Sequence, residues 1–329
     1  MTDEEVAPNA IGSTLGLLGD EWSLQLVRYA FAGVRRYGDW KEQLGIADAV
    51  LSARLVALVD GGIFARHTYS ERPLRHEYRL TDAGLDLWRV LLTIWSWELH
   101  HVPGQAERLP RMVHATCGAE FEPVLRCARC HALVGVDDVD IALGPSGAFE
   151  RSVPTGANRR RATRSSARSA AGMFPETMAL IGSRWSSALL GAAFLGATRF
   201  TDFAAMIGAA PTVVAERLRS FTDLGVLEPV EVDGRPDRST YHLTAKGRAF
   251  FPAVACFLAW GEQWRPAPDG PAVVATHHGC NRAFVPELGC STCSASLTRQ
   301  SVVVTPDDQG STKSTVTPRS RSTSKKPSK

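Results

Sequence analysis

The sequence predicts a mainly α-helical protein with small β wings, built as two tandem winged-helix domains that are each followed by a small β segment. Two observations support this fold class: an internal repeat, and the order of elements within each copy. The stretch 18–22, Leu-Gly-Asp-Glu-Trp, returns at 181–185 as Ile-Gly-Ser-Arg-Trp, and the stretch 78–84 returns at 241–247. The offset of 163 residues holds without a gap over more than 110 positions, so the chain is one module written twice.

The first half of each copy predicts a helix-turn-helix. Apolar residues recur at helical spacing over 11–32, a stretch that Gly19 could break and Gly33 ends. A short helix over 39–44, a turn at 45–48 and a third helix that ends at Gly61 follow. In the second copy, Thr201 is the expected N-cap of the short helix. Two short helices joined by a tight turn form this DNA-binding motif.

The second half of each copy predicts a hairpin and a long helix. Residues 63–80 alternate around a polar tip, and 226–243 repeat this around an Asp233-Gly234 turn. Amphipathic helices are expected over 81–101 and 244–263. Helix-turn-helix, hairpin wing and long helix, in that order, describe a winged helix, which places one helix in the major groove and the wing on adjacent phosphates.

Length and composition limit the class of protein. A chain of 329 residues with 44% hydrophobic and 22% charged residues suits two globular domains and excludes a wholly disordered or fibrous protein. No apolar run approaches the roughly 18 residues of a membrane span, and the acidic start MTDEEVAPNA does not resemble a secretory signal. We therefore expect a cytoplasmic protein with no membrane partner.

The charge of +3 is unevenly distributed. Residues 1–143 carry 14 basic and 20 acidic side chains and residues 173–304 carry 11 of each, so the basic excess lies in 144–172 and 305–329. The first of these segments is rich in Gly, Ser and Ala, and the second lacks the apolar residues needed to offset the entropy of ordering, so both are expected to be flexible. A nucleic-acid footprint usually lies on a folded face, so charge alone supports DNA binding only weakly. The expected divisions are a first winged helix at 1–104, a β segment at 105–143, a flexible basic linker at 144–172, a second winged helix at 173–267, a β segment at 268–304 and a disordered basic tail at 305–329.

The pattern His-x2-Cys-x9-Cys-x2-Cys occurs at 114–130 and again at 277–293. Three thiolates and one imidazole suit tetrahedral zinc, so each β segment is expected to be a small zinc-ribbon-like hairpin, with up to two structural zinc ions in the chain. The alternative is a bare hairpin packed by reduced cysteines, and His278 beside His277 leaves the ligand choice open in the second copy. The expected ligands are His114, Cys117, Cys127, Cys130, His277, Cys280, Cys290 and Cys293.

The remaining cysteine and the repeated tryptophans are expected to be core residues. Cys256 lies among apolar residues of the long helix, and Trp22, Trp97, Trp185 and Trp260 recur at helical apolar positions. Aromatic residues between helices could also line a pocket for a small-molecule effector.

The chain resembles the HxlR-type family of bacterial winged-helix transcription regulators over 11–101 and 174–264. The matching stretches are 18–22, Arg35-Arg36-Tyr37, Val50-Leu51-Ser52-Ala53-Arg54-Leu55 and 78–84, with their equivalents in the second copy. The resemblance implies a dimer of winged helices on a near-palindromic operator, so the two copies could form a pseudo-dimer within one chain, or the chain could form a homodimer. The sequence departs from the family in three ways. Its recognition helices are poor in basic residues, with Ala49, Ala53 and Val56 in the first copy and Thr212 and Glu216 in the second. The sensing cysteine of some members is replaced by Asn9 and Gly172, and a conventional member is a single short module without the cysteine-bearing extensions.

Candidate DNA contacts follow from the positions of these residues within the motif. Arginine forks suit phosphate or a narrow minor groove, and the start of the recognition helix faces base edges. The alternative is that Arg54 and Arg217 are structural arginines and the wing charges are merely solvated. Residues 35–80 carry 8 basic and 6 acidic side chains, against 5 and 7 for 198–243, so the first copy should bind DNA more strongly. The candidates are Ser52, Arg54, Thr212 and Arg217 in the recognition helices, Arg36 and Arg199 before them, and Arg66, Arg72, Arg75, His76, Arg235 and Arg238 in the wings.

The expected function is therefore a DNA-binding transcriptional regulator, with a repressor preferred, that reads a near-palindromic operator with two modules in one chain. An enzyme is not expected, because the sequence has no phosphate-binding glycine loop, no nucleophile elbow and no open metal site. The alternative is a winged-helix and zinc-ribbon scaffold for proteins or RNA that lacks sequence-specific DNA binding. Salt titration separates the two, because only operator binding should weaken steeply with salt.

Overall fold

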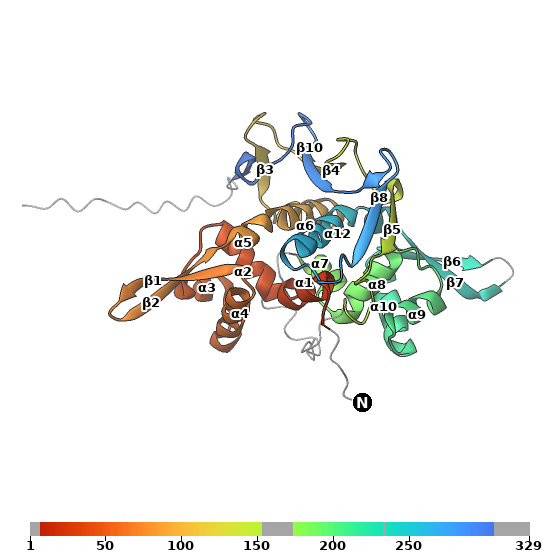
Figure 1. The fold of residues 1–329 in the computed structure, drawn as a ribbon, viewed down its shortest axis with the longest axis horizontal. Coiled ribbons are helices and arrows are strands. Elements are labelled where there is room, and N and C mark those ends of the chain that lie inside the picture. The colour runs from red at the N-terminus through yellow and green to blue at the C-terminus, as the bar shows by residue number, and fades with distance from the viewer. Residues whose placement is uncertain (1–6, 153–173, 233–234, 306–329) are drawn as a thin grey trace, which may run out of the picture.

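The computed structural model describes residues 7–152, 174–232 and 235–305, and it contains two winged-helix modules (Figure 1). The first module comprises α1 (Ala10–Leu18), α2 (Glu21–Phe31), α3 (Tyr37–Leu44), α4 (Asp48–Asp60), β1 (Phe64–Glu71), β2 (Leu74–Leu80), α5 (Asp82–Asp86) and α6 (Trp88–His101). The second comprises α7 (Pro175–Ile181), α8 (Arg184–Phe194), α9 (Phe200–Ile207), α10 (Pro211–Asp223), β6 (Leu227–Val232), β7 (Arg235–Leu243), α11 (Ala245–Arg248) and α12 (Phe251–Trp264).

The first long helical stretch is two helices, and a polar cap starts the second one. The Asp20 carboxylate accepts hydrogen bonds from the backbone N–H groups of Trp22 and Ser23, at 3.1 and 3.2 Å, and so begins α2. In the second copy, the Ser183 hydroxyl accepts one from Ser186 N–H at 3.1 Å. The break that Gly19 suggested is therefore fixed by a cap.

The stretch after each wing also differs from the expected single helix. Leu87 separates α5 from α6, and Ala249 and Phe250 separate α11 from α12. Thr81 begins α5 by accepting the Gly84 N–H at 3.1 Å. The N-cap expected at Thr201 is wrong, because α9 starts one residue earlier and Arg199 occupies the cap position.

The long helices α6 and α12 pack against each other and join the two modules. The indole N–H of Trp97 donates to the carbonyl of Lys246 at 3.0 Å, and that of Trp260 donates to the carbonyl of Ala83 at 2.8 Å. Each of these bonds is the other displaced by the repeat offset, so the modules are related by a pseudo-two-fold axis. Trp97 and Trp260 are buried, as expected, whereas Trp22 and Trp185 are only half-buried.

The β segments pair between copies, which the sequence did not predict. The first copy supplies β3 (Arg111–His114), β4 (Pro123–Cys127) and β5 (Val139–Leu143), and the second supplies β8 (Val273–His277), β9 (Arg282–Ala283), β10 (Pro286–Cys290) and β11 (Val302–Thr305). The antiparallel pairs β3–β11, β4–β10 and β5–β8 each join one copy to the other. The zinc-ribbon-like hairpin expected inside 105–143 is therefore wrong as a self-contained unit: in this segment, the described strands pair within the copy only through isolated bridges such as Val113 to Glu120.

The first part of the expected linker belongs to the fold. Ser146 is fully buried, and the Arg151 guanidinium forms an ion pair with Asp269 at 2.5 Å. The rest of the expected linker, and the tail after Thr305, lie outside the described residues. Within the described part of the chain, no helix is long and apolar enough to cross a membrane.

Candidate nucleic-acid interface and metal clusters

The two helix-turn-helix units lie on one side of the molecule. In Figure 1, α4 and the pair α9–α10 extend downwards, the wings β1–β2 and β6–β7 extend to opposite ends, and β3, β4 and β10 lie on the other side of α6 and α12. The two recognition helices are α4 and α10, because each follows the turn of its motif.

The recognition helices bury one face and expose another. Helix α4 buries Leu51, Leu55 and Leu58, and α10 buries Val214, Leu218 and Phe221 at the equivalent positions. Their exposed residues differ between the copies. The first copy exposes Ser52, Ala53 and Val56, whereas the second exposes Thr212, Glu216 and Arg219.

Arg54 is held inside its own module. Its Nε lies 3.2 Å from Oδ1 of Asp20, the carboxylate that caps α2, and its side chain is only 27% exposed. The second copy has Ser183 in place of Asp20, and Arg217 instead pairs with its neighbour Glu216 at 2.5 Å. The geometry therefore favours a structural role for Arg54 over a direct contact with DNA.

A polar cluster occupies the start of α4. The Tyr37 hydroxyl lies 2.9 Å from Oδ1 of Asp48 and 3.2 Å from the Ser52 hydroxyl, and the Lys41 ammonium lies 2.7 Å from Oδ2 of Asp48. The hydrogen bond from Lys41, followed by that from Tyr37, lowers the pKa of Asp48 below its usual range. This carboxylate thus stays ionised but paired. The second copy has Phe200, Ala204, Pro211 and Ala215 at these positions and lacks the cluster.

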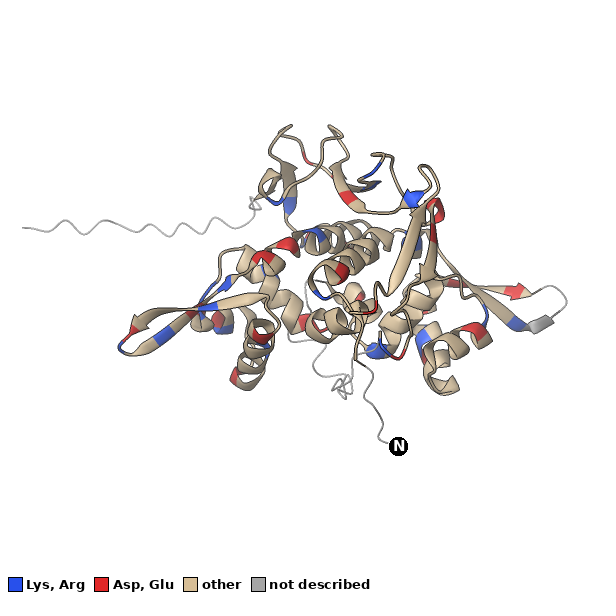
Figure 2. Ribbon diagram, viewed as in Figure 1, with Lys and Arg blue, Asp and Glu red and all other residues tan. Residues whose placement is uncertain are grey.

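The other candidates lie mostly at exposed positions. Arg36 lies over the ring of Tyr69, 4.7 Å from its centroid, and Arg199 is exposed at the equivalent position. Arg66, Arg72 and Arg75 are exposed on the first wing and Arg238 on the second, whereas His76 is half-buried with Nδ1 3.2 Å from the Thr68 hydroxyl. The Arg235 side chain lies outside the described residues. Figure 2 shows several basic residues along β1–β2.

Arg219 is a further candidate that the sequence reasoning missed. It is exposed on α10 at the position of Val56, whose side chain is 59% exposed on α4. The signal was available, because the repeat offset aligns an arginine with an apolar residue on a face that packing leaves free.

Each candidate metal-binding cluster takes two residues from each copy. His114 and Cys117 meet Cys290 and Cys293 in the first cluster, and Cys127 and Cys130 meet His277 and Cys280 in the second. Within each cluster, the ligand atoms all lie within 4.8 Å of one another. The grouping of four ligands within one copy is therefore wrong, although the eight residues are those expected.

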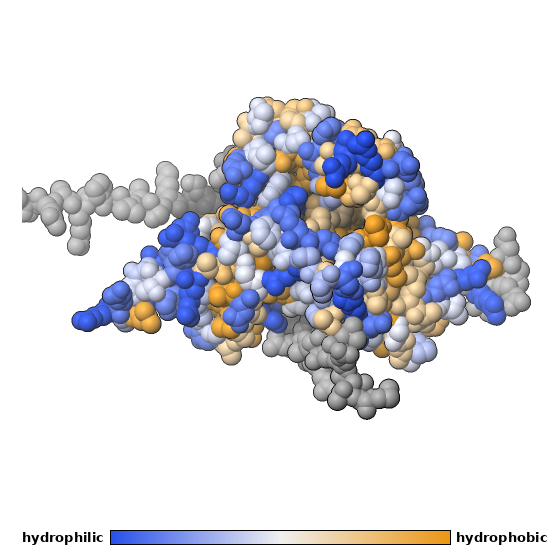
Figure 3. Space-filling model, in the orientation of Figure 1, coloured by the Kyte–Doolittle hydropathy of each residue, from blue (hydrophilic) through white to orange (hydrophobic). Residues whose placement is uncertain are grey.

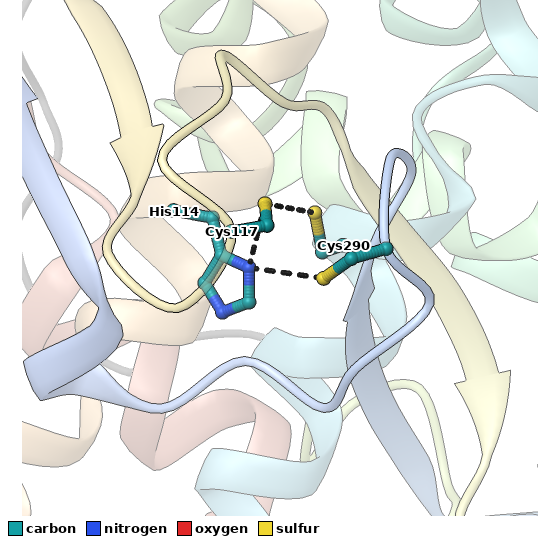
Figure 4. A group of neighbouring side chains, drawn as sticks. His114, Cys117 and Cys290 are labelled. Carbon is teal, nitrogen blue, oxygen red and sulfur yellow. Dashed lines mark hydrogen bonds between the residues drawn. The ribbon is translucent and has the colours of Figure 1, made fainter.

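The distances suit a tetrahedral ion. Nδ1 of His114 lies 3.4 Å from Sγ of Cys117 and 3.3 Å from Sγ of Cys293, and the sulfurs of Cys117 and Cys290 are 4.0 Å apart (Figure 4). In the second cluster, Nδ1 of His277 lies 3.4 Å from the sulfurs of both Cys130 and Cys280. Bonds of ~2.3 Å to sulfur and ~2.0 Å to nitrogen place tetrahedral ligands ~3.8 Å and ~3.5 Å apart.

The surroundings of the clusters indicate which histidine belongs to the second cluster and which cluster residues are buried. His278, the competing histidine, instead places Nε2 3.0 Å from Oδ1 of Asp140, so His277 is the cluster residue. His114 and His277 are buried, as are Cys127 and Cys290. Each cluster therefore has a buried imidazole and a buried thiol at its base.

An apolar pocket lies where the copies meet, between α1, α6, α8, α12 and the strands β5 and β8. Its free space is about 980 Å³, including the open mouth, and Figure 3 shows apolar surface gathered near α8. Among the lining residues, only Ser152 and Ser187 carry polar side-chain groups, and both already have hydrogen-bond partners. Gly191 lines this pocket, whereas the equivalent residue of the first copy is Arg28, which lines the related pocket there.

These modules define the class of the protein: a helix-turn-helix transcriptional regulator rather than an enzyme. The HxlR-like helix-turn-helix family matches residues 17–106 and 180–269, and the chain belongs to that family as a tandem duplication. It is 39% identical over 136 residues to the HTH-type transcriptional regulator Rv3095 of Mycobacterium tuberculosis, covering 41% of this chain and 86% of that protein. It is 31% identical over 101 residues to YdzF of Bacillus subtilis, also named an HTH-type transcriptional regulator, covering 30% and 87%. The solved transcription-factor structure PA1374 from Pseudomonas aeruginosa has 32% identity and a TM-score of 0.31, and the match covers 38% of this chain and 84% of that one.

Proposed function

We propose that the chain is a cytoplasmic repressor that binds a near-palindromic operator in double-stranded DNA with both winged helices at once. The observation that supports this most is the placement of α4 and α10 on one side of a joint made by α6 and α12 (Figure 1). Two recognition helices that are held on the same side of the molecule suit two half-sites on one face of a duplex. The chain would then act as an intrachain pseudo-dimer and would repress by occupying its site.

The two half-sites should differ, because the two exposed helix faces differ. Val56 offers an apolar contact of the kind made to a thymine methyl group, whereas Arg219 offers a guanidinium fork of the kind that binds guanine. This is why the operator is expected to be only nearly palindromic. Arg36, Arg199 and the wing arginines would contact phosphates and position the helices.

Footprinting on the DNA upstream of the chain's own gene would locate the operator. Inserting five base pairs between the half-sites should abolish tight binding, because it turns one half-site to the opposite face of the duplex. Binding should also weaken steeply as salt rises. A shallow salt dependence with no footprint would instead favour the protein or RNA scaffold.

Variants separate positioning from base reading. Arg72→Ala with Arg75→Ala should weaken binding to operator and scrambled duplex equally and lower the salt slope by about 1–2. Arg219→Ala should weaken operator binding more than scrambled binding, by about 10-fold or more. Arg111→Ala is the control, because this exposed arginine starts β3 on the opposite side.

Arg54→Ala tests the two roles of Arg54. If Arg54 reads bases, the variant loses operator binding selectively while its stability is unchanged. If the Asp20 ion pair is its main role, the variant is destabilised and its operator and scrambled affinities fall together.

Zinc in a structural role is the metal that best suits the two Cys3His clusters. Four protein ligands fill a tetrahedral shell and leave no position for a substrate, and thiolates select soft ions. When bound, zinc would supply cross-linking and no chemistry. Purified protein should contain zinc, and Cys127→Ser with Cys130→Ser should lose one ion and melt at a lower temperature.

A neutral, apolar small molecule is the effector that suits the pocket beside α8. A charged or strongly polar ligand would lose its hydration there without finding a free partner, because both serines are already bonded. Helices α6 and α12, which set the spacing of the modules, form part of the wall, so a bound molecule would act on DNA spacing.

The neutral dye N-phenyl-1-naphthylamine tests this site through its fluorescence. Gly191→Leu should abolish binding, because a Cβ at Gly191 meets no atom closer than 4.0 Å and the larger side chain would occupy the pocket. Gly38→Leu, at a helical glycine with nothing within 4 Å, is the control. Equal dye binding by both variants would contradict the site.

A further inference from the structure

The pairing of β4 with β10 separates ligands that lie close in sequence. The register is antiparallel, with Cys127 opposite Pro286 and Cys290 opposite Pro123. Cys127 and Cys290 therefore lie at opposite ends of a ladder that is five residues long. At ~3.3 Å per residue, their backbones are ~13 Å apart.

This separation excludes a metal site within either copy. The sulfurs that share one zinc ion lie within ~4 Å of each other. Cys117 lies 4.0 Å from Cys290, at one end of the ladder, and so cannot also reach Cys127 at the other end. The same register keeps Cys280, which belongs with Cys127, away from Cys290.

We infer that each cluster holds one zinc ion shared between the two copies, so that two ions fasten the first copy to the second at the two ends of the β4–β10 ladder. This inference rests on the proposed zinc binding and adds to it the partition of the ligands. One ion has His114, Cys117, Cys290 and Cys293 as ligands, and the other has Cys127, Cys130, His277 and Cys280.

The position of the clusters indicates a structural role for the ions, which is to hold α6 and α12 together. The ladder packs against the helices that join the modules, because β4 contacts α6 and β10 contacts α12. Beside the ladder, the Trp95 indole in α6 donates to the carbonyl of Pro110 at 2.9 Å, and Phe251 of α12 stacks on Phe284 with centroids 6.3 Å apart. Fastening the strands therefore fixes α6 against α12. The metal thus stabilises the spacing of α4 and α10 without touching DNA.

Paired variants test the partition by counting zinc per chain. Cys117→Ser with Cys290→Ser removes ligands from one shared site, so one ion should remain. Cys117→Ser with Cys127→Ser damages both shared sites, so no ion should remain. Cys256→Ser is the matched control and should keep two ions. The reverse pattern, with one ion kept by Cys117→Ser and Cys127→Ser, would overturn the sharing and leave zinc binding intact.

A second measurement uses the unaltered chain, so it does not depend on the folding of a variant. Chelator is added until about half the zinc is lost, N-ethylmaleimide is applied briefly, and top-down mass spectrometry finds the labels in molecules that keep one ion. Labels should occur together on Cys117, Cys290 and Cys293, or together on Cys127, Cys130 and Cys280. The triplet Cys117, Cys127 and Cys130 would overturn the inference. Purified protein without zinc would overturn both this inference and the proposed metal, while leaving the DNA proposal standing.

Discussion

Glu98 is a carboxyl group buried at the joint between the copies. It is fully buried on α6, and it accepts hydrogen bonds from Thr177 N–H at 2.7 Å and from the Gln105 amide at 3.1 Å. Burial raises its pKa above the usual glutamate range, more than these hydrogen bonds lower it. The equivalent residue is Gly261, where a side chain would meet the Thr14 hydroxyl at 2.7 Å. The first copy therefore has a carboxyl group at this position and the second copy has none.

Glu98→Gln should remove a pH dependence of stability. Because the folded state raises this pKa, the carboxyl contributes its full stability below the unfolded-state pKa and loses it as pH rises through the folded-state value. Relative to the parent protein, the glutamine variant should therefore gain unfolding free energy as pH rises from 4 to 7. Denaturant titrations at several pH values measure the difference. A difference that is flat with pH, or that reverses, would contradict the assignment.

Cys256 should be inert while the protein is folded. Burial raises its pKa to about 12, so at pH 8 only about one thiol in 10⁴ is ionised, and the thiolate is the reactive form. A pulse of iodoacetamide should leave the Cys256 peptide unmodified in native protein and modify it fully in guanidinium chloride. Rapid labelling of the native protein would show that this part of α12 opens.

At the scale of the element, the short helix after each wing carries a glycine at the same position, Gly84 in α5 and Gly247 in α11. A close backbone contact explains why this residue is glycine. A Cβ at Gly84 would lie 2.3 Å from the carbonyl oxygen of Ile63, and one at Gly247 would lie 2.3 Å from that of Val226. Gly84→Ala and Gly247→Ala should each destabilise the protein by about 1–3 kcal/mol. Gly38→Ala, at an open helical position, should instead stabilise it by about 0.5–1 kcal/mol. Chemical unfolding measures all three, and equal effects would contradict the close contact.

The elements of the winged helix could be predicted from the sequence because their signals are local. Helical spacing, the turn glycines and the repeated Tyr-x-Leu-Thr motif each act within a few residues, and the repeat confirms them. The split at Leu87 was missed because no proline or glycine marks it and the apolar pattern continues. The partners of β3, β4 and β5 were missed for another reason. The alternation of residues in a strand indicates which side chains face the core, but it does not indicate which segment of the chain pairs with that strand.

At the scale of the whole molecule, the candidate site was predictable in its residues and not in its grouping. All eight candidate ligands occur in two identical patterns, but nine residues between the Cys and Cys-x2-Cys parts suit a local hairpin as well as a shared site. The antiparallel register of β4 and β10 and the distances between the side chains distinguish the two groupings. Similarly, the ion pair of Arg54 with Asp20 could not be predicted from the sequence, because it joins residues 34 positions apart.

The pseudo-two-fold axis leads to a prediction for the first copy alone. Some contacts between the copies do not repeat, such as the ion pair of Arg151 with Asp269, because position 106 of the first copy is alanine. The reciprocal tryptophan bonds and the three strand pairs that join the copies, however, use positions that the first copy also carries. Residues 1–152 should therefore form a homodimer in which His114 and Cys117 of one chain meet Cys127 and Cys130 of its partner. Light scattering should give twice the chain mass, with one zinc per chain. A monomer that binds zinc would contradict the prediction, because it would show that one copy can close the site by itself.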